Sequence, residues 1–198
     1  MAWVIVGLGN PGEEYASTRH NTGRMAVEFF ARDGGFQEFH EDKKVKAHIA
    51  GGMIGKTAVA LVLPDTFMNK SGSALAKYVK SVKAAERLIV VYDDLDLPLG
   101  TMKLSFDRGS GGHRGLESVI RAVKTKKFIR VRIGVSPTTT SGKLHKPQGE
   151  KAVLDFILTK FTSSEAKKLK NVFKRTAHAM HTIVREGREH AMNEFNSK

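Results

Sequence analysis

One histidine and one aspartate in this 198-residue chain occupy positions where acid–base chemistry is expected. His20 lies in a Gly-rich loop that follows a short apolar strand starting near Val4, and Asp93 directly follows the apolar run 87–92 (RLIVVY). Loops at the carboxyl ends of strands converge on one edge of an α/β sheet, where ligands bind. The carboxylate would then hold the imidazole as a base. Without that pairing, His20 would be an ordinary surface histidine.

Water is the expected nucleophile. The chain has no cysteine, and it contains no serine in a G-x-S-x-G turn. A metal site built from His20, His113 and the acidic trio Asp93, Asp94 and Asp96 is conceivable, but no H-E-x-x-H or similar ligand spacing occurs. We therefore do not expect a metal here.

Two asparagines are further candidates for the site. Asn10 lies in the first loop and Asn69 at the entry of a predicted helix. Two amides in one pocket would orient a substrate amide or a water through paired donors and acceptors. The alternative is that they satisfy loop backbone, which is the usual role of Asn beside Pro and Gly.

The first loop also resembles a dinucleotide fingerprint, because GLGNPG follows a strand. The spacing does not fit: Pro11 and the long loop to Arg24 prevent the third glycine from opening a helix, and no acidic residue ends a following strand about 20 positions on. A nucleotide-dependent oxidoreductase is therefore rejected, and the glycines are interpreted as shaping a pocket.

The elements that would position these residues indicate a single α/β domain over 1–198. We predict a three-layer sandwich: a mixed, mostly parallel twisted sheet with helices on both faces and a basic C-terminal helix. After the first strand, strands are expected at 45–52, 56–63, 87–92, 102–106 and 128–135, and helices at 24–32, 67–82, 114–124, 152–158 and from a cap at 163–165 to about 188.

A formal charge of +13 and a pI near 10.0 favour a polyanionic partner, with nucleic acid ahead of an anionic membrane. The excess is concentrated in 124–132 and 160–188. Arg130 and Arg132 alternate with apolar residues, so both should leave one face of a strand and extend a phosphate track with the basic helix. The alternative is a solvated surface.

No apolar window reaches the roughly 18 residues of a membrane span, and a strand from Trp3 leaves no room for a leader, so the cytoplasm is expected.

Five ordered blocks resemble bacterial-type peptidyl-tRNA hydrolase: VGLGNPGEEYASTRHNTG, PDTFMNKSGSAL, VVYDDLDLPLG, SGGHRGLESVI and VRIGV. The resemblance implies a monomeric enzyme that hydrolyses the ester between a peptide and the 3′ end of tRNA. It needs no metal, cofactor or obligate protein partner. His20 would be the general base and Asp93 its support, Asn10 would contact the peptide, and Asn69 would position water or the carbonyl. The cleft would be lined for the 3′ terminal adenosine or the peptide by Tyr15, Phe67 and Met68.

The chain departs from the family at three places. Arg114, beside His113, stands where the family usually has a substrate-contacting Asn; we assign both to substrate binding and expect Arg114 to strengthen RNA contact without abolishing hydrolysis. Lys103 and Arg132 fit the clamp for the 5′ phosphate of the acceptor stem. Ser105 stands at an often basic place, so the clamp is weaker or shared with Arg108. The loop 138–149, a mobile lid-like insertion, is longer than the family's.

A different class of function remains open at this point. Plant organelles use a peptidyl-tRNA-hydrolase-like protein as an intron splicing factor, and such a binder would keep the basic surface. Retention of the two asparagines, His20 and Asp93 favours the enzyme, whereas Arg114 keeps the RNA-binding alternative open.

Overall fold

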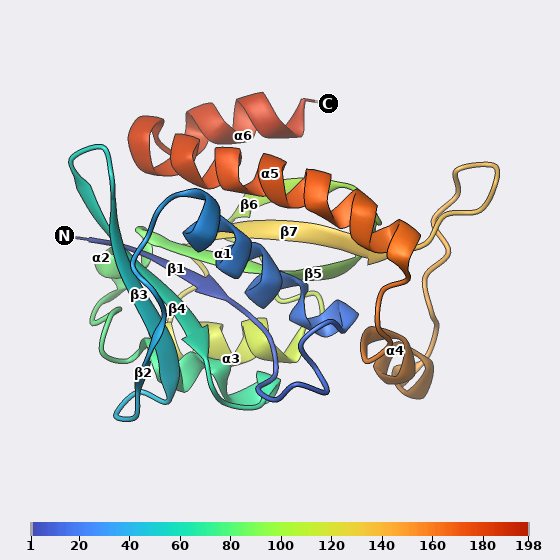
Figure 1. Cartoon of the computed structure of the whole chain (residues 1–198), viewed down its shortest axis with the longest axis horizontal. Helices are drawn as coiled ribbons and strands as arrows, with labels where there is room; N and C mark the ends of the chain where they lie inside the picture. The colour runs from blue at the N-terminus through green and yellow to red at the C-terminus, as the bar shows by residue number, and fades with distance from the viewer. Residues whose placement is uncertain (1, 198) are drawn as a thin grey trace.

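A computed structural model describes residues 2–197, and within them the chain forms one seven-stranded sheet of order β2-β3-β4-β1-β5-β7-β6 (Figure 1). The strands are β1 (Trp3–Gly7), β2 (His40–Asp42), β3 (Ala47–Ile54), β4 (Thr57–Pro64), β5 (Leu88–Pro98), β6 (Met102–Phe106) and β7 (Ile129–Ser136). The helices are α1 (Thr22–Asp33), α2 (Val82–Ala85), α3 (Arg114–Val123), α4 (Glu150–Ile157), α5 (Ser163–Glu186) and α6 (Arg188–Asn196), with 3-10 helices η1 (Arg19–Asn21) and η2 (Met68–Leu75).

The four central strands, β4, β1, β5 and β7, run parallel, while the outer strands pair antiparallel. Strands β1 and β5, at the middle of the sheet, are covered on both faces, so their sequences are apolar without alternation, as in VIV and IVV. The carboxyl ends of all four strands lie at one edge of the sheet, and both η1 and the loop before α3 lie beside that edge. The predicted mixed, mostly parallel sheet is confirmed.

Helices cover both faces, as expected for three layers. One face carries α1, α5 and α6 over a core that includes Ile5, Phe30, Ile89 and Met180. The opposite face carries η2, α2 and α3. Their apolar residues pack on the strand side chains that point to this second face, including Val6 and Val90. No helix of residues 2–197 is both long and apolar enough to cross a membrane.

The helix predicted over 67–82 is wrong. Residues 68–75 form the 3-10 helix η2, and after a turn only the four residues of α2 are α-helical. The hydroxyls of Ser71 and Ser73 donate to the carbonyls of Met68 and Lys70, three residues back. Side-chain bonds of this kind compete with regular helical pairing. The Gly72 amide in turn donates to Ser118 Oγ of α3 at 3.0 Å, which fixes the tight turn.

The long basic helix is confirmed as α5, with its predicted inward residues buried: Leu169, Val172, Phe173, Met180, Ile183 and Val184. Its N-cap is Thr162, not a residue of 163–165, and Glu165 completes a capping box. Gly187, with φ 93°, ends α5 and starts α6, which the sequence analysis did not predict. The short edge strand β2 was not predicted either.

Two glycines let α1 pack directly on the sheet beneath His20. A Cβ at Gly23 would lie 2.1 Å from the Val91 carbonyl oxygen and 2.9 Å from the Leu8 amide, and both are backbone atoms. Gly7 faces the same contact, since its Cβ would lie 2.6 Å from the Gly23 carbonyl oxygen. The glycines of the first loop therefore set the distance between β1, β5 and the helix that follows His20.

We expect Gly23→Ala to lower the free energy of unfolding by about 1 to 3 kcal/mol, because the added methyl group overpacks a rigid contact. Chemical denaturation measures this change. Gly109→Ala is the matched control, since no atom lies within 4 Å of the position of its Cβ. Equal stability of the two variants would contradict the close-packing argument.

Candidate active site

A cleft of about 840 Å³ opens at the carboxyl edge of the parallel strands. One wall comes from the first loop and the start of η2, the floor from the end of β5, and the other walls from the loop before α3 and one face of α4. It contains nearly every residue assigned from sequence: Asn10, Tyr15, His20, Phe67, Met68, Asn69, Asp93, His113, Arg114 and Arg132. Lys103 does not line it.

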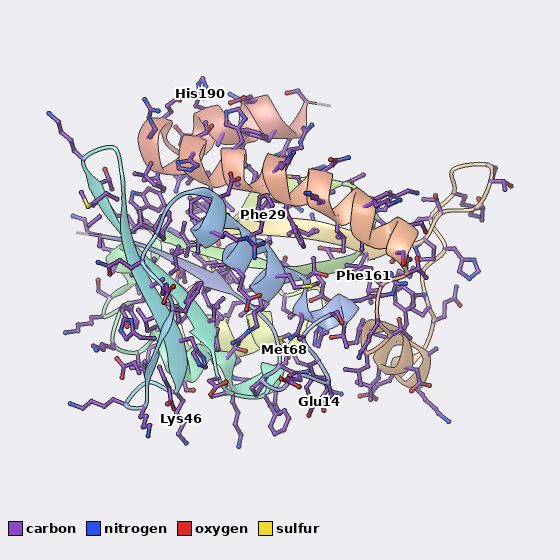
Figure 2. The ribbon with its side chains drawn as sticks, in the orientation of Figure 1. Glu14, Phe29, Lys46, Met68, Phe161 and His190 are labelled. Atoms are coloured by element: carbon purple, nitrogen blue, oxygen red, sulfur yellow. The ribbon has the colours of Figure 1, made fainter. Side chains whose placement is uncertain are left out.

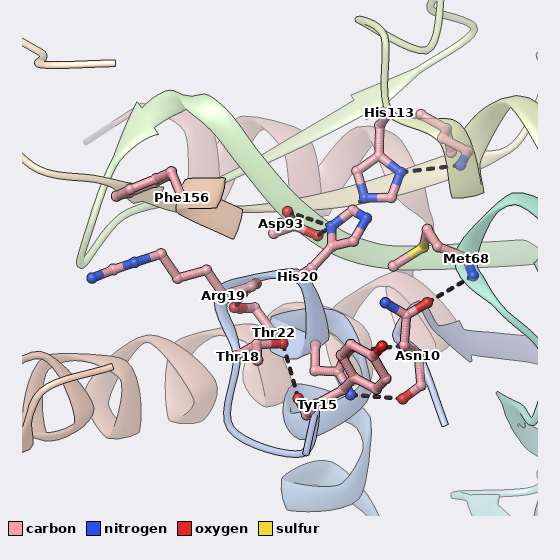
Figure 3. Close-up of polar contacts among 12 residues, drawn as sticks. Asn10, Tyr15, Thr18, Arg19, His20, Thr22, Met68, Asp93, His113 and Phe156 are labelled. Carbon is pink, nitrogen blue, oxygen red and sulfur yellow. Dashed lines mark hydrogen bonds and ion pairs between the residues drawn. The ribbon is translucent and has the colours of Figure 1, made fainter. Parts of the chain in front are cut away.

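His20 and Asp93 meet at the floor of this cleft, as the sequence analysis proposed (Figure 3). His20 Nδ1 lies 3.1 and 3.0 Å from the two carboxylate oxygens of Asp93. The carboxylate can only accept, so Nδ1 carries the proton and Nε2 keeps a lone pair. A buried imidazole in this tautomer can act as a base.

His113 contacts the same carboxylate, which the sequence analysis did not predict. Its Nε2 lies 3.0 Å from Asp93 Oδ1, and its Nδ1 accepts from the Leu116 amide at 3.2 Å as the N-cap of α3. The cap fixes the tautomer, because an acceptor Nδ1 leaves the proton on Nε2. Asp93 thus takes N–H donors from two histidines whose ring centres lie 5.0 Å apart.

The electrostatics of Asp93 follow from these contacts. Burial acts to raise the pKa of this fully buried carboxyl, but the charges and N–H donors of His20 and His113 outweigh it and hold the pKa well below its usual range. Next to it, burial and the charge of Asp94 raise the pKa of the Tyr92 phenol to about 12. Asp93 is therefore a permanent anion beneath His20 at neutral pH.

Asn10 satisfies loop backbone, which is one of the two roles considered from sequence. Its Oδ1 accepts from the Met68 amide at 2.8 Å, which ties the first loop to η2. Its backbone exchanges two 2.9 Å hydrogen bonds with the side chain of Asn21, a residue to which the sequence analysis gave no role. Its amide nitrogen lies on the side toward His20 (Figure 3). Asn10 therefore presents a rigidly held donor to the cleft.

The cleft also exposes apolar surface. Phe67, Leu154 and Leu158 are 61%, 47% and 37% exposed and all line it, although large apolar side chains are usually covered. Tyr15 is half-buried and Asn69 exposed beside them. Such a surface suits a ligand with a flat or apolar part.

Arg19 anchors the histidine segment, a role that the sequence analysis did not predict. Its Nη2 donates to both Glu165 oxygens at 2.8 and 3.0 Å, and its Nε donates to Thr159 Oγ1 at 3.0 Å. Its guanidinium carbon lies 4.7 Å from the ring centres of both Phe156 and Phe161. The backbone neighbour of His20 is thus fastened to α4 and α5. The sequence pattern indicates that Glu165 belongs to a helix cap, but it does not indicate that Glu165 also pairs with Arg19.

The prediction that both Arg130 and Arg132 are available to a phosphate is wrong for Arg130. Arg132 is half-buried and its Nε donates to Asp94 Oδ2 at 2.7 Å, with Lys103 opposite it on β6. Arg130 shares that face but is fully buried against Phe128, and it donates to the Arg108 carbonyl. The loop after β6 covers it, so Arg130 is unable to contact a ligand from the surface.

Two ion pairs cross the mouth of the cleft. Arg114, at the first position of α3, pairs with Glu150, at the first position of α4. Lys146, in the loop that precedes α4, pairs with Asp96 at 2.5 Å. The loop 138–149 is thus tied to the end of β5 on the side of the cleft.

Among residues 2–197, His20, Asp93 and His113 form the group of possible metal ligands, with ligating atoms within 4.8 Å of one another. As arranged, each histidine donates an N–H to the carboxylate, and a cation would have to displace both protons. The geometry therefore fits a supported base.

The comparisons with known proteins agree in one family. The family model described as Peptidyl-tRNA hydrolase matches residues 4–198. Similar curated proteins of that name come from Chloroflexus aggregans, 41% identical over 98% of both chains, and Aquifex aeolicus, 37% identical over 98% of this chain and 95% of the relative. The solved structure of peptidyl-tRNA hydrolase from Acinetobacter baumannii is 31% identical, with a TM-score of 0.87 over 99% of this chain and 95% of that one.

The low pKa of Asp93 predicts acid sensitivity. A depressed carboxyl pKa contributes stability that is complete above the unfolded-state value of about 3.9 and is lost as the pH falls toward the folded-state value. We expect the free energy of unfolding of the wild type to fall more steeply than that of Asp93→Asn below about pH 4, by at most about 1.4 kcal/mol per pH unit. Urea titrations from pH 6 to pH 2.5 measure the difference, and parallel curves would refute it.

Proposed function

Since the chain belongs to the peptidyl-tRNA hydrolase family and so hydrolyses the ester of peptidyl-tRNA, we propose that His20 Nε2 activates the attacking water in the cleft described above. The observation that carries this proposal is the 3.0 Å contact between His20 Nδ1 and Asp93 Oδ2, which leaves Nε2 as the basic atom facing the substrate. The alternative of a non-catalytic RNA binder gives no reason for a buried anion under that histidine.

The proposed steps need only a proton carried by His20. Water attacks the ester carbonyl and gives a proton to Nε2, while Asp93 stabilises the imidazolium through Nδ1–H. The tetrahedral intermediate collapses with release of the peptide carboxyl group, and the imidazolium returns the proton to the 3′ oxygen of the RNA. His113 is a positioning residue here, because its Nε2–H holds Asp93 Oδ1 and so orients the carboxylate.

Asn10 and Asn69 are proposed to align the substrate. The amide nitrogen of Asn10 would donate to the peptide carbonyl next to the ester, and exposed Asn69 would position the water or the scissile carbonyl. Tyr15, Phe67 and Met68 would line the part of the cleft that takes the terminal adenosine or the peptide. The exposed ring of Phe67 is suited to stacking on a base.

The acceptor stem is proposed to lie against β6 and β7. Lys103 and Arg132 are directly opposite each other in the β6–β7 register, so their charges share one face of the sheet edge and suit the 5′ phosphate. Ser105 is buried next to Arg130, which leaves Arg108 on the cleft wall as the other basic candidate.

We expect His20→Ala to lower the turnover of an N-blocked aminoacyl-tRNA by about 10² to 10⁴, the usual contribution of a general base. Binding of deacylated tRNA should remain, since His20 donates nothing to the RNA phosphates. His190→Ala is the control, because His190 lies on α6, on the helical face far from the cleft (Figure 2). Unchanged turnover in His20→Ala would exclude His20 as the base, and a wild type that binds without cleaving would leave only the RNA-binding alternative.

The 5′-phosphate clamp predicts a salt effect. The logarithm of the tRNA binding constant should fall linearly with the logarithm of salt concentration, and Lys103→Gln should reduce the slope by about 0.7 to 0.9, one phosphate contact. Lys77→Gln, which removes a lysine paired with Asp42 away from the cleft, should leave the slope unchanged. Identical slopes for Lys103→Gln and the wild type would remove Lys103 from the clamp.

A further inference from the structure

The cations of the cleft are largely neutralised by its own carboxylates. Among the described residues, four basic side chains line the cleft, and three of them are ion-paired with acids that also line it: Arg114 with Glu150, Arg132 with Asp94, and Lys146 with Asp96. Despite the net charge of +13, most of the positive charge in the cleft is therefore paired with the protein's own carboxylates, with Arg108 as the exception.

The Arg114–Glu150 pair is the most exposed of the three. The two side chains are 63% and 82% exposed, against 24% and 11% for Arg132 and Asp94. Exposed pairs contribute little net free energy, because water solvates both partners when they separate. An incoming anion can therefore replace Glu150 on Arg114 at small cost.

The position of the Arg114–Glu150 pair indicates which anion would replace Glu150. Arg114 directly follows His113, which holds the Asp93 carboxylate beneath His20. The ester of the substrate is one ribose away from the last backbone phosphate of the RNA, so that phosphate must lie close to the residues that surround His20. A phosphodiester and a carboxylate both present two oxygens to the planar fork of a guanidinium.

We propose that Glu150 is an internal substitute for an RNA phosphate: when peptidyl-tRNA binds, the last backbone phosphate displaces Glu150 and takes over Arg114. The inference rests on the proposed function, because the phosphate is placed by the ester at His20. Its consequence is that the free enzyme pairs Arg114 with its own carboxylate, and only an anion that the substrate brings to this position competes with Glu150.

The test compares Glu150→Gln with Glu189→Gln, using deacylated tRNA as the probe. Both substitutions remove one negative charge, and Glu189 likewise pairs with an arginine, Arg188, but on α6 outside the cleft. We expect Glu150→Gln to tighten tRNA binding about two- to five-fold relative to Glu189→Gln, the range that an exposed ion pair permits. Equal affinities would overturn the proposal.

A second pair of variants identifies the partner. Arg114→Asn should weaken tRNA binding, and the effect of Glu150→Gln should disappear in the Arg114→Asn background. Persistence of that effect would show that Glu150 acts on something other than Arg114, and an effect seen only with acidic peptidyl substrates would replace the phosphate with a peptide carboxylate. Cleavage by the wild type is scored separately, so a failed exchange leaves the hydrolase mechanism intact, whereas absent cleavage refutes that mechanism.

Discussion

The structure of the site depends on one buried anion. Asp93 is 4% exposed, and its charge is kept in the interior because two imidazole N–H groups donate to it from different elements. An unpaired buried carboxylate would be protonated or would destabilise the fold, so the two histidines and the aspartate are mutually required. The same contacts set both tautomers, which leaves a lone pair on His20 Nε2 and makes His113 Nδ1 the acceptor that caps α3.

This arrangement requires that three separate segments of the chain keep their positions relative to one another. β5 carries Asp93, the N-cap of α3 is His113, and η1 carries His20, next to Arg19. Arg19 is buried, its Nη2 donates to both oxygens of the partly exposed Glu165, and two aromatic rings flank its guanidinium, so removing Glu165 would leave that buried cation without its carboxylate. The capping box of α5 thereby also holds the segment that carries His20.

Much of the fold was predictable, because burial leaves a direct pattern in sequence. The apolar run that ends at Asp93, the inward side chains of α5 and the boundaries of β6 and α3 follow from periodicity and turn residues. Partners distant in sequence do not leave such a pattern. Nothing local indicates that Arg19 meets Glu165, 146 residues away, or that His113 shares Asp93. Arg130 and Arg132 look identical in the alternation of β7, and only the loop that covers one of them makes it a core residue.

The charges on the outer surface attract the RNA from a distance, whereas those in the cleft recognise its end. The exposed lysines of α5, such as Lys167, Lys170 and Lys174, lie on the outer layer and contribute a long-range field that draws a polyanion to the protein. That field does not depend on the RNA sequence and is screened by salt. It therefore helps the RNA to meet the protein but does not position the RNA end. In the cleft, by contrast, most cations are paired with fixed carboxylates. Recognition there becomes an exchange of one anion for another, which depends on geometry, and the +13 charge of the chain says little about where the RNA end is positioned.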